Sequence, residues 1–190
     1  MILASRSPRR KELLGSCGVE FSVFDAGVGE LTPECGIALE ELPVANARLK
    51  AQAVAQQFPQ ELVLGADTMV ICGDRAYGKP EDENASFRML SELSGKTHRV
   101  ITGVALICPE RRICELWSGV TRVQFKVLSG ETIREYIQKV NTLDKAGAYA
   151  IQEHGELIID SIDGEMENVI GLPLIRLKEL LRQFQVPEVE

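Results

Sequence analysis

The sequence predicts an α/β fold, a mixed β-sheet with flanking helices, on three observations. Short strand-like segments and helical apolar stripes interleave along the chain. Residues 61–72, ELVLGADTMVIC, form a nearly continuous apolar run, which is typical of a strand buried on both faces. Two strand-like segments, 98–108 and 111–128, follow each other with only Pro109-Glu110 between them, so the sheet is expected to be mixed.

The N-terminal elements are predicted from local signals. Ile2–Ala4 is short and apolar, as a first strand would be. Ser7 is an N-cap candidate with Pro8 at the first helical position, and Gly18 is expected to end that helix. Residues 19–23 then alternate in polarity, which predicts a strand.

Residues 25–40 are expected to form a loop, because glycine and proline interrupt them repeatedly. A helix is expected from about Pro43. Its apolar stripe consists of Val44, Ala47, Ala51, Val54, Ala55 and Phe58. Lys50 lies away from this stripe, so its position alone predicts a solvated lysine.

Three more helices and one further strand are expected after residue 80. The first helix covers 82–93 and is closed by Ser94-Gly95. Ser129 caps the second, and the third begins at Pro173. A short apolar stretch, 157–162, is the strand candidate. The apolar stripes of the last two helices are Ile133, Tyr136, Ile137 and Val140, and Leu177, Leu180, Leu181 and Phe184.

The composition is that of a soluble globular protein. The 190 residues suffice for one substantial domain or two small lobes, and 45% of them are hydrophobic and 26% charged. No apolar run approaches the roughly 20 residues that span a membrane. The N-terminus lacks the features of a signal peptide, so we expect a cytoplasmic location and no membrane partner.

Charge and cysteine content narrow the possible ligands. A net charge of −7 argues against a nucleic-acid polymer as partner, but it allows a small anion held by a local basic cluster. Five cysteines without CxxC spacing predict free thiols rather than disulfides or a zinc site. With only two histidines, a catalytic metal is expected to be a hard cation on carboxylates.

The first predicted helix begins with an unusual concentration of cations. Arg9 and Arg10 lie in its first turn, where the helix dipole disfavours a positive charge by roughly 0.3–1 kcal/mol. A bound anion would make the positive charges favourable, because the free N–H groups, the helix dipole and the guanidinium groups would all attract the anion. A solvated basic helix start is the alternative, and the sequence leaves both open.

Asp67 is unusual because it interrupts an apolar run. An unpaired buried carboxylate is costly, so we expect Asp67 at the end of its strand beside a cation, a metal or a catalytic water. The alternative is an ordinary turn over 65–68. Lys79, between Gly78 and Pro80, has the pattern of a solvated loop lysine.

Six segments carry a wider resemblance: LASRSPRRKELL, LGADTMV, GKP, LSGKTHRVITGVAL, DKAGAYAIQ and NVIGLPL. In order and spacing they resemble the Maf family of nucleoside triphosphate pyrophosphatases over essentially the whole chain. DKAGAYAIQ resembles the branch that acts on dTTP and UTP. Without the resemblance, the small residues of this segment would allow the backbone to approach a ligand closely, and the amide of Gln152 could recognise the edge of a base. The alternative interpretation is an ordinary glycine-containing connection without a ligand.

The resemblance implies a hydrolase acting on acid anhydrides. It would cleave dTTP and UTP, or modified pyrimidine nucleotides, between the α- and β-phosphates to the monophosphate and pyrophosphate, as a house-cleaning enzyme. The implied fold is one domain over 1–190, similar to inosine triphosphate pyrophosphatase, with a long cleft between two lobes. A homodimer is implied as well.

The resemblance also implies roles for individual residues. Asp67 matches the catalytic proton acceptor, and Ser5 and Glu30 match polar positions in the same cleft. The cationic positions around the triphosphate are Arg9, Lys50 and Lys79. The positions linked to substrate choice are Arg10, Thr68 and Gln152.

A divalent cation, Mg²⁺ or Mn²⁺, is expected on Glu30 and Asp67. Triphosphate hydrolysis needs charge neutralisation and an oriented water, which the ion and the cationic side chains would supply. Direct coordination would lower the basicity of Asp67, so base and ligand remain alternative roles. Gly29 precedes Glu30 where the family commonly has an acidic pair.

Two other functions remain open. One is 7-methyl-GTP pyrophosphatase activity, which Tyr149 and Gln152 in their motif disfavour. The other is a nucleotide-binding regulator of septum formation without significant turnover, which the intact Asp67, Lys50 and Lys79 disfavour.

Overall fold

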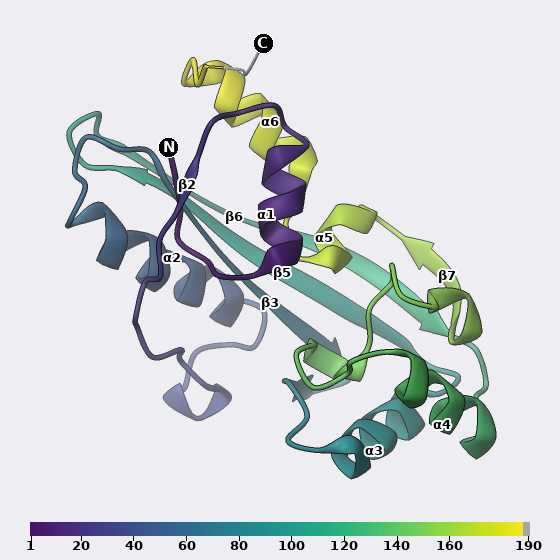
Figure 1. The fold of residues 1–190 in the computed structure, drawn as a ribbon. Coiled ribbons are helices and arrows are strands. Elements are labelled where there is room, and N and C mark those ends of the chain that lie inside the picture. The colour runs from purple at the N-terminus through teal and green to yellow at the C-terminus, as the bar shows by residue number, and fades with distance from the viewer. Residues whose placement is uncertain (188–190) are drawn as a thin grey trace. The chain divides into compact units, whose positions relative to one another are not determined.

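The computed structural model describes residues 1–187. Its strands are β1 (Ile2–Leu3), β2 (Ser22–Val23), β3 (Val63–Cys72), β4 (Arg75–Tyr77), β5 (Thr97–Cys108), β6 (Ile113–Phe125) and β7 (Ile159–Asp163). They form one seven-stranded sheet in the order β2-β1-β3-β5-β6-β7, with β4 paired to β3 (Figure 1). β1 is parallel to β2 and β3, whereas β4 and β7 are antiparallel to their neighbours. The predicted mixed sheet is therefore confirmed.

The helices begin close to where the sequence places them. They are α1 (Pro8–Gly15), α2 (Leu42–Ala55), α3 (Glu83–Leu93), α4 (Gly130–Lys139), α5 (Met166–Ile170) and α6 (Leu174–Gln183), with 3-10 turns η1 (Pro33–Cys35), η2 (Ala146–Ala148) and η3 (Gly155–Leu157). Ser7 and Ser129 are N-caps as predicted, each accepting a hydrogen bond from a backbone N–H of the first turn. Within residues 1–187, no helix is both long and apolar enough to cross a membrane.

Two expectations about local elements are wrong, and two short elements were not predicted. α1 ends at Gly15 rather than Gly18, because Ser16 already makes the capping bonds to Glu12 and Leu14. The strand expected over 19–23 is reduced to the two residues of β2. β4 and α5 are too short to show a periodic pattern, and the sequence did not predict them.

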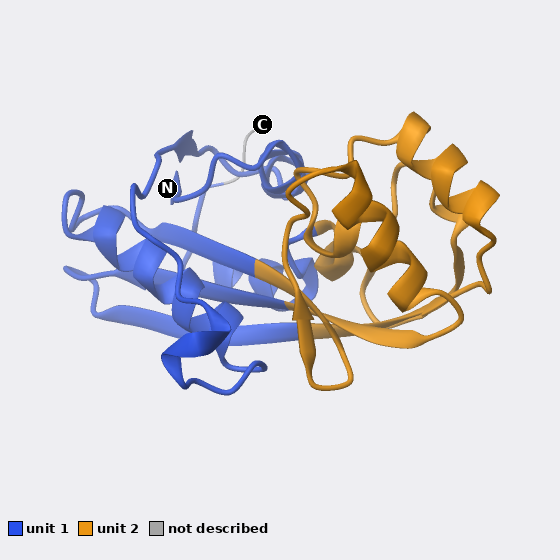
Figure 2. Cartoon of the chain, turned by 90° about the horizontal axis from the view of Figure 1, so that it is seen from below, with its two compact units in different colours: residues 1–67, 102–119, 171–190 blue, residues 68–101, 120–170 orange. Residues whose placement is uncertain are grey.

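The chain divides into two compact units, coloured differently in Figure 2. Unit 1 contains residues 1–67, 102–119 and the chain from 171 onward. Unit 2 contains residues 68–101 and 120–170. β3, β5 and β6 each contribute residues to both units. The single domain over 1–190 with a cleft between two lobes stays a prediction.

Unit 1 is built in three layers. On one face of its strands, α1 and α6 share a core with alternate strand residues; its members include Leu14, Leu64, Ala66, Leu106, Leu177 and Leu181. On the other face, α2 packs through Ala47, Ala51 and Val54 against Val63, Ala105 and Ile107. Because side chains alternate along a strand, Asp67 belongs to the same face of β3 as Val63, the face toward α2.

Two glycines allow α2 to pack directly on the sheet. A Cβ at Gly65 would lie 2.3 Å from the carbonyl oxygen of Ala47, and one at Gly103 would lie 2.2 Å from the backbone nitrogen of Val44. These distances are far below van der Waals contact, so only glycine fits at either position. The backbone of α2 therefore approaches β3 and β5 more closely than side chains would permit.

Unit 2 has one core, which includes a buried histidine. Residues of α3 and α4 pack against its strands; the core includes Leu90, Leu93, Val100, Val123, Ile133 and Tyr136. His98 is 1% exposed, its ring makes edge-on contacts with Phe125 and Tyr149, and its Nε2 lies 2.8 Å from the Tyr149 hydroxyl. Burial lowers the pKa of His98 to about 4. His98 is therefore a neutral core residue at pH 7, as expected for a histidine that is not a catalytic base.

We expect this histidine to make the protein sensitive to acid. The unfolded chain binds a proton at His98 near pH 6.5, whereas the folded protein resists protonation until about pH 4. The free energy of unfolding should thus fall as the pH drops through this window, by up to about 3 kcal/mol. Urea unfolding at several pH values should show a weaker pH dependence in His98→Gln. His154→Gln, which removes an exposed histidine 3.4 Å from Glu156, is the control, and its pH dependence should differ from wild type far less than that of His98→Gln. Identical pH dependence in all three proteins would contradict the prediction.

Candidate functional site

Asp67 lies inside β3, neither at the end of the strand nor in a turn over 65–68. Both positional expectations are therefore wrong, and the reason is that the carboxylate is fully partnered where it lies. It is 8% exposed, and its Oδ1 accepts a hydrogen bond from Lys50 Nζ at 2.8 Å. Its Oδ2 accepts one from Asn46 Nδ2 at 3.2 Å. The expected neighbouring cation is thus confirmed, and the strand continues without a break.

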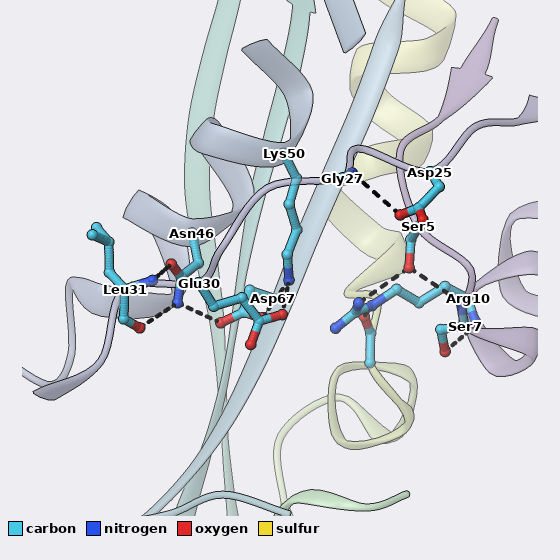
Figure 3. A network of polar contacts seen from close by, with 11 residues as sticks. Ser5, Ser7, Arg10, Asp25, Gly27, Glu30, Leu31, Asn46, Lys50 and Asp67 are labelled. Carbon is cyan, nitrogen blue, oxygen red and sulfur yellow. Dashed lines mark hydrogen bonds and ion pairs between the residues drawn. The ribbon is translucent and has the colours of Figure 1, made fainter. Parts of the chain in front are cut away.

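Lys50 connects two carboxylates. Its Nζ lies 2.8 Å from Asp67 Oδ1 and 2.6 Å from Glu30 Oε1 (Figure 3). Only 12% of its side chain is exposed, against 58% for Glu30. The solvated lysine that the helix pattern predicts is therefore wrong. The pattern treats every polar side chain as facing solvent, but the close packing of α2 on β3 brings this one to a buried carboxylate.

Asn46 is a site residue that the sequence did not predict. It is 2% exposed and lies one helical turn before Lys50 on α2. Its Nδ2 donates to Asp67 Oδ2 and also to the Leu31 carbonyl at 3.1 Å, and its Oδ1 accepts from the Leu31 N–H at 2.7 Å (Figure 3). The available signal was spacing, because residues four apart on a helix share a face. A polar residue four positions before Lys50 could have been tested against Asp67.

Arg10 is held by the protein at the start of α1. Its Nη1 donates to Ser5 Oγ at 3.3 Å (Figure 3). Its Nε donates to the Gly171 carbonyl at 2.9 Å. Burial lowers the pKa of Arg10, whereas the carboxylates of Asp67 and Glu30 raise it. The guanidinium group is therefore half-buried among hydrogen-bond acceptors rather than extended into solvent. Its positive charge interacts with the carboxylates of Asp67 and Glu30.

The nine residues predicted for the site are divided between the two units. Unit 1 contains Ser5, Arg9, Arg10, Glu30, Lys50 and Asp67, and Arg9 is half-buried at the second position of α1. Unit 2 contains three others. Thr68 follows Asp67 in β3 and is half-buried, Lys79 is exposed after β4, and Gln152 is exposed in the turn between η2 and η3. That all nine line one cleft stays a prediction.

Within unit 2, the segments of Lys79 and Gln152 are anchored to each other and to a buried lysine. The Gly147 N–H donates to the Gly78 carbonyl at 3.0 Å, next to Lys79. Lys145 is 4% exposed, and its Nζ lies 2.9 Å from Asp144 Oδ1 and 3.2 Å from Glu153 Oε1. Lys145 thus contacts Asp144 before Gln152 and Glu153 after it, and so holds both ends of this segment.

The carboxylate pair is the candidate metal position. Within the described part of the chain, no group of three or more His, Cys, Asp or Glu side chains could hold an ion. Glu30 Oε1 and Asp67 Oδ1 nevertheless converge on a single point, which Lys50 Nζ occupies at 2.6 and 2.8 Å. Two carboxylate oxygens fit a Mg²⁺-type ion that keeps water and takes its other ligands from substrate phosphates.

Comparisons with known proteins identify the family of the chain. The family model of Maf-like proteins matches residues 1–184. A dTTP/UTP pyrophosphatase of Akkermansia muciniphila is 46% identical over 174 residues, 92% of this chain and 90% of the relative. Proteins of the same name from Geobacter sulfurreducens and Clostridioides difficile are 44% and 39% identical, each over 97% of this chain and over 96% and 94% of the relative. On this evidence the chain belongs to the Maf family.

Proposed function

We propose that this protein hydrolyses dTTP and UTP between the α- and β-phosphates, giving the nucleoside monophosphate and pyrophosphate. The observation that carries the proposal is the contact of Lys50 with both Asp67 and Glu30 on the α2 face of β3. Relatives that cover nearly the whole chain bear the name dTTP/UTP pyrophosphatase, which supports the choice of substrate.

The chemistry follows from the partners of Asp67. Its carboxylate is the proposed proton acceptor for the attacking water, and Lys50 and Asn46 hold its two oxygens in a fixed orientation. Hydrolysis of a triphosphate then depends on neutralising the charge of the phosphates and of the departing pyrophosphate. We assign that role to the cationic side chains, which are Arg9, Arg10, Lys50 and Lys79.

A Mg²⁺ or Mn²⁺ ion is proposed on Glu30 and Asp67. When bound, it would neutralise phosphate charge and orient the triphosphate. Lys50 Nζ contacts the same two oxygens, so a bound ion would share these carboxylates with Lys50. As a metal ligand, Asp67 would be a weaker base.

A panel of nucleoside triphosphates tests the function directly. We expect Mg²⁺- or Mn²⁺-dependent pyrophosphate release to be fastest with dTTP and UTP. Fastest release with 7-methyl-GTP would instead support the other catalytic branch. Nucleotide binding without release would support a regulator of septum formation. The proposed homodimer is tested separately by light scattering, and a cytoplasmic location by cell fractionation.

Gln152→Ala is expected to change base selectivity without changing stability. The side chain is exposed, so the free energy of unfolding should not change, but an amide contact to the base edge would be lost. We expect the ratio of kcat/KM for UTP over CTP to fall about tenfold. Gln138→Ala, an exposed glutamine on α4, is the control. An unchanged ratio would place base recognition elsewhere.

A further inference from the structure

We infer that Asn46 is a positioning residue that fixes the carboxylate of Asp67 and the Glu30 segment relative to each other. The inference rests on the proposed function and assigns Asn46 no contact with substrate. It draws on a feature independent of the catalytic assignments, namely a buried amide on α2 whose bonds all go to β3 and to the loop before η1.

The amide uses both of its N–H groups. One donates to Asp67 Oδ2 at 3.2 Å and the other to the Leu31 carbonyl at 3.1 Å, while Oδ1 accepts from the Leu31 N–H at 2.7 Å. A flipped amide would direct an oxygen at two acceptors and an NH₂ group at a donor. The side chain therefore has one satisfactory orientation, and burial at 2% exposure raises the cost of any other.

The contact with Asp67 fixes the rotation of the carboxylate. Asn46 binds Oδ2 from one side and Lys50 binds Oδ1 from the other, so each oxygen has its own donor. Without Asn46, the carboxylate could turn about its Cβ–Cγ bond while keeping the contact with Lys50. A proton acceptor must be held close to its working geometry, so this freedom should slow the reaction.

The contacts with Leu31 fix the neighbouring carboxylate. Glu30 precedes Leu31 in a loop that contains Gly27, Gly29 and Gly36, and this loop has few conformational restraints of its own. Two hydrogen bonds hold the Leu31 backbone to Asn46, which determines where the Glu30 side chain begins. Glu30 itself contacts Lys50 through its side-chain carboxylate at 2.6 Å, and the Leu31 bonds add a restraint on the backbone that this side-chain contact does not provide.

The experiment compares two variants that remove different bonds. Asn46→Leu has a similarly branched but larger side chain, and it loses all three bonds. Asn46→Asp keeps the acceptor for the Leu31 N–H, but it replaces the donor to Asp67 with an acceptor. It also adds a like charge beside Asp67, so its effect on kcat combines loss of the hold on Asp67 with electrostatic repulsion. Arg48→Ala, at an exposed position on the same helix, is the control. Circular dichroism melting establishes that each variant is folded, and Asn46→Asp keeps the test valid if Asn46→Leu does not fold.

We expect kcat for dTTP to fall 10- to 100-fold in both Asn46 variants, in the range seen when an outer-shell partner is lost. KM should change less than threefold, and Arg48→Ala should match wild type. Amide exchange at Leu31, measured by NMR, should accelerate in Asn46→Leu but less in Asn46→Asp. A purely structural role would lower the melting temperature without this division between kcat and KM.

Two results overturn the inference: kcat within twofold of wild type in both variants, or unchanged Leu31 exchange in Asn46→Leu. If wild type releases no pyrophosphate from any nucleotide, the proposed function fails. The exchange measurement needs no turnover, so it still decides whether Asn46 holds the Glu30 segment.

Discussion

Asp67→Asn is expected to abolish pyrophosphate release and to leave the fold intact. The new amide has nearly the same shape but carries no charge and cannot take a proton from water. Loss of a general base costs about 10²–10⁴ in rate, so kcat for dTTP should fall at least a hundredfold. Steady-state release of pyrophosphate at saturating nucleotide would check this.

The contacts of Asp67 explain why the free energy of unfolding of Asp67→Asn should change little. Both oxygens of Asp67 accept hydrogen bonds, one from Lys50 and one from Asn46. An amide can accept from only one of them, so one donor loses its partner. Lys50 retains Glu30, so the orientation with the amide oxygen toward Asn46 is tolerable. We expect a loss of about 1–2 kcal/mol in the free energy of unfolding.

Asp74→Asn is the matched control for the charge change. Asp74 is exposed in the turn between β3 and β4, so the substitution removes one carboxylate far from α2 in sequence. This variant should turn over dTTP at the wild-type rate. Wild-type kcat in a folded Asp67→Asn protein would remove Asp67 from the mechanism and with it the proposed chemistry.

The chemistry around Asp67 could be predicted from the sequence, but its position could not. The cost of an unpaired buried carboxylate correctly predicts a cation beside it. The same argument placed Asp67 at the end of the strand, because it did not foresee two donors from a helix packed on the strand. Those donors depend on Gly65 and Gly103, and the sequence alone gives no indication that a helix crosses over them.

Helix patterns predicted which face of α2 is buried but not its polar contacts. Ala47, Ala51 and Val54 lie in the core as expected. Asn46 and Lys50 belong to the edge of that face, where a hydrophobic pattern cannot distinguish solvent from a polar partner. The role of Lys50 could therefore be inferred only from the family resemblance, and Asn46 was missed.

The sequence predicted the cations at the start of α1 but not the protein groups that contact Arg10. Neither of the two alternatives that the sequence leaves open, an anion-binding site or a solvated helix start, includes the contacts of Arg10 with the protein. Its guanidinium donates to Ser5 and to the carbonyl of Gly171, and the Asp67 and Glu30 carboxylates partly offset the lowering of its pKa by burial. The Gly171 contact joins residues 161 positions apart, which local sequence signals cannot predict.

Gly103→Ala is expected to destabilise the protein strongly and to disturb the site. The nearest atoms to the added methyl would be the carbonyl carbon of Pro43 and the nitrogen of Val44, both at 2.2 Å. Both belong to the backbone, so no side-chain rotation can relieve the overlap. Overpacking typically costs 1–3 kcal/mol, and a clash with a helix backbone should reach or exceed about 3 kcal/mol. Urea unfolding measures this loss.

The displacement needed to accept the methyl should also separate α2 from β3. Asn46 and Lys50 would then move away from Asp67, so kcat should fall in the fraction that remains folded. Gly15→Ala is the control, because a Cβ there meets no atom within 4 Å and alanine favours a helix by up to about 1 kcal/mol. We expect that variant to be as stable as wild type or slightly more stable. A Gly103→Ala protein with wild-type stability and kcat would mean that α2 can shift freely on the sheet, and the close packing would then not be what brings Lys50 to Asp67.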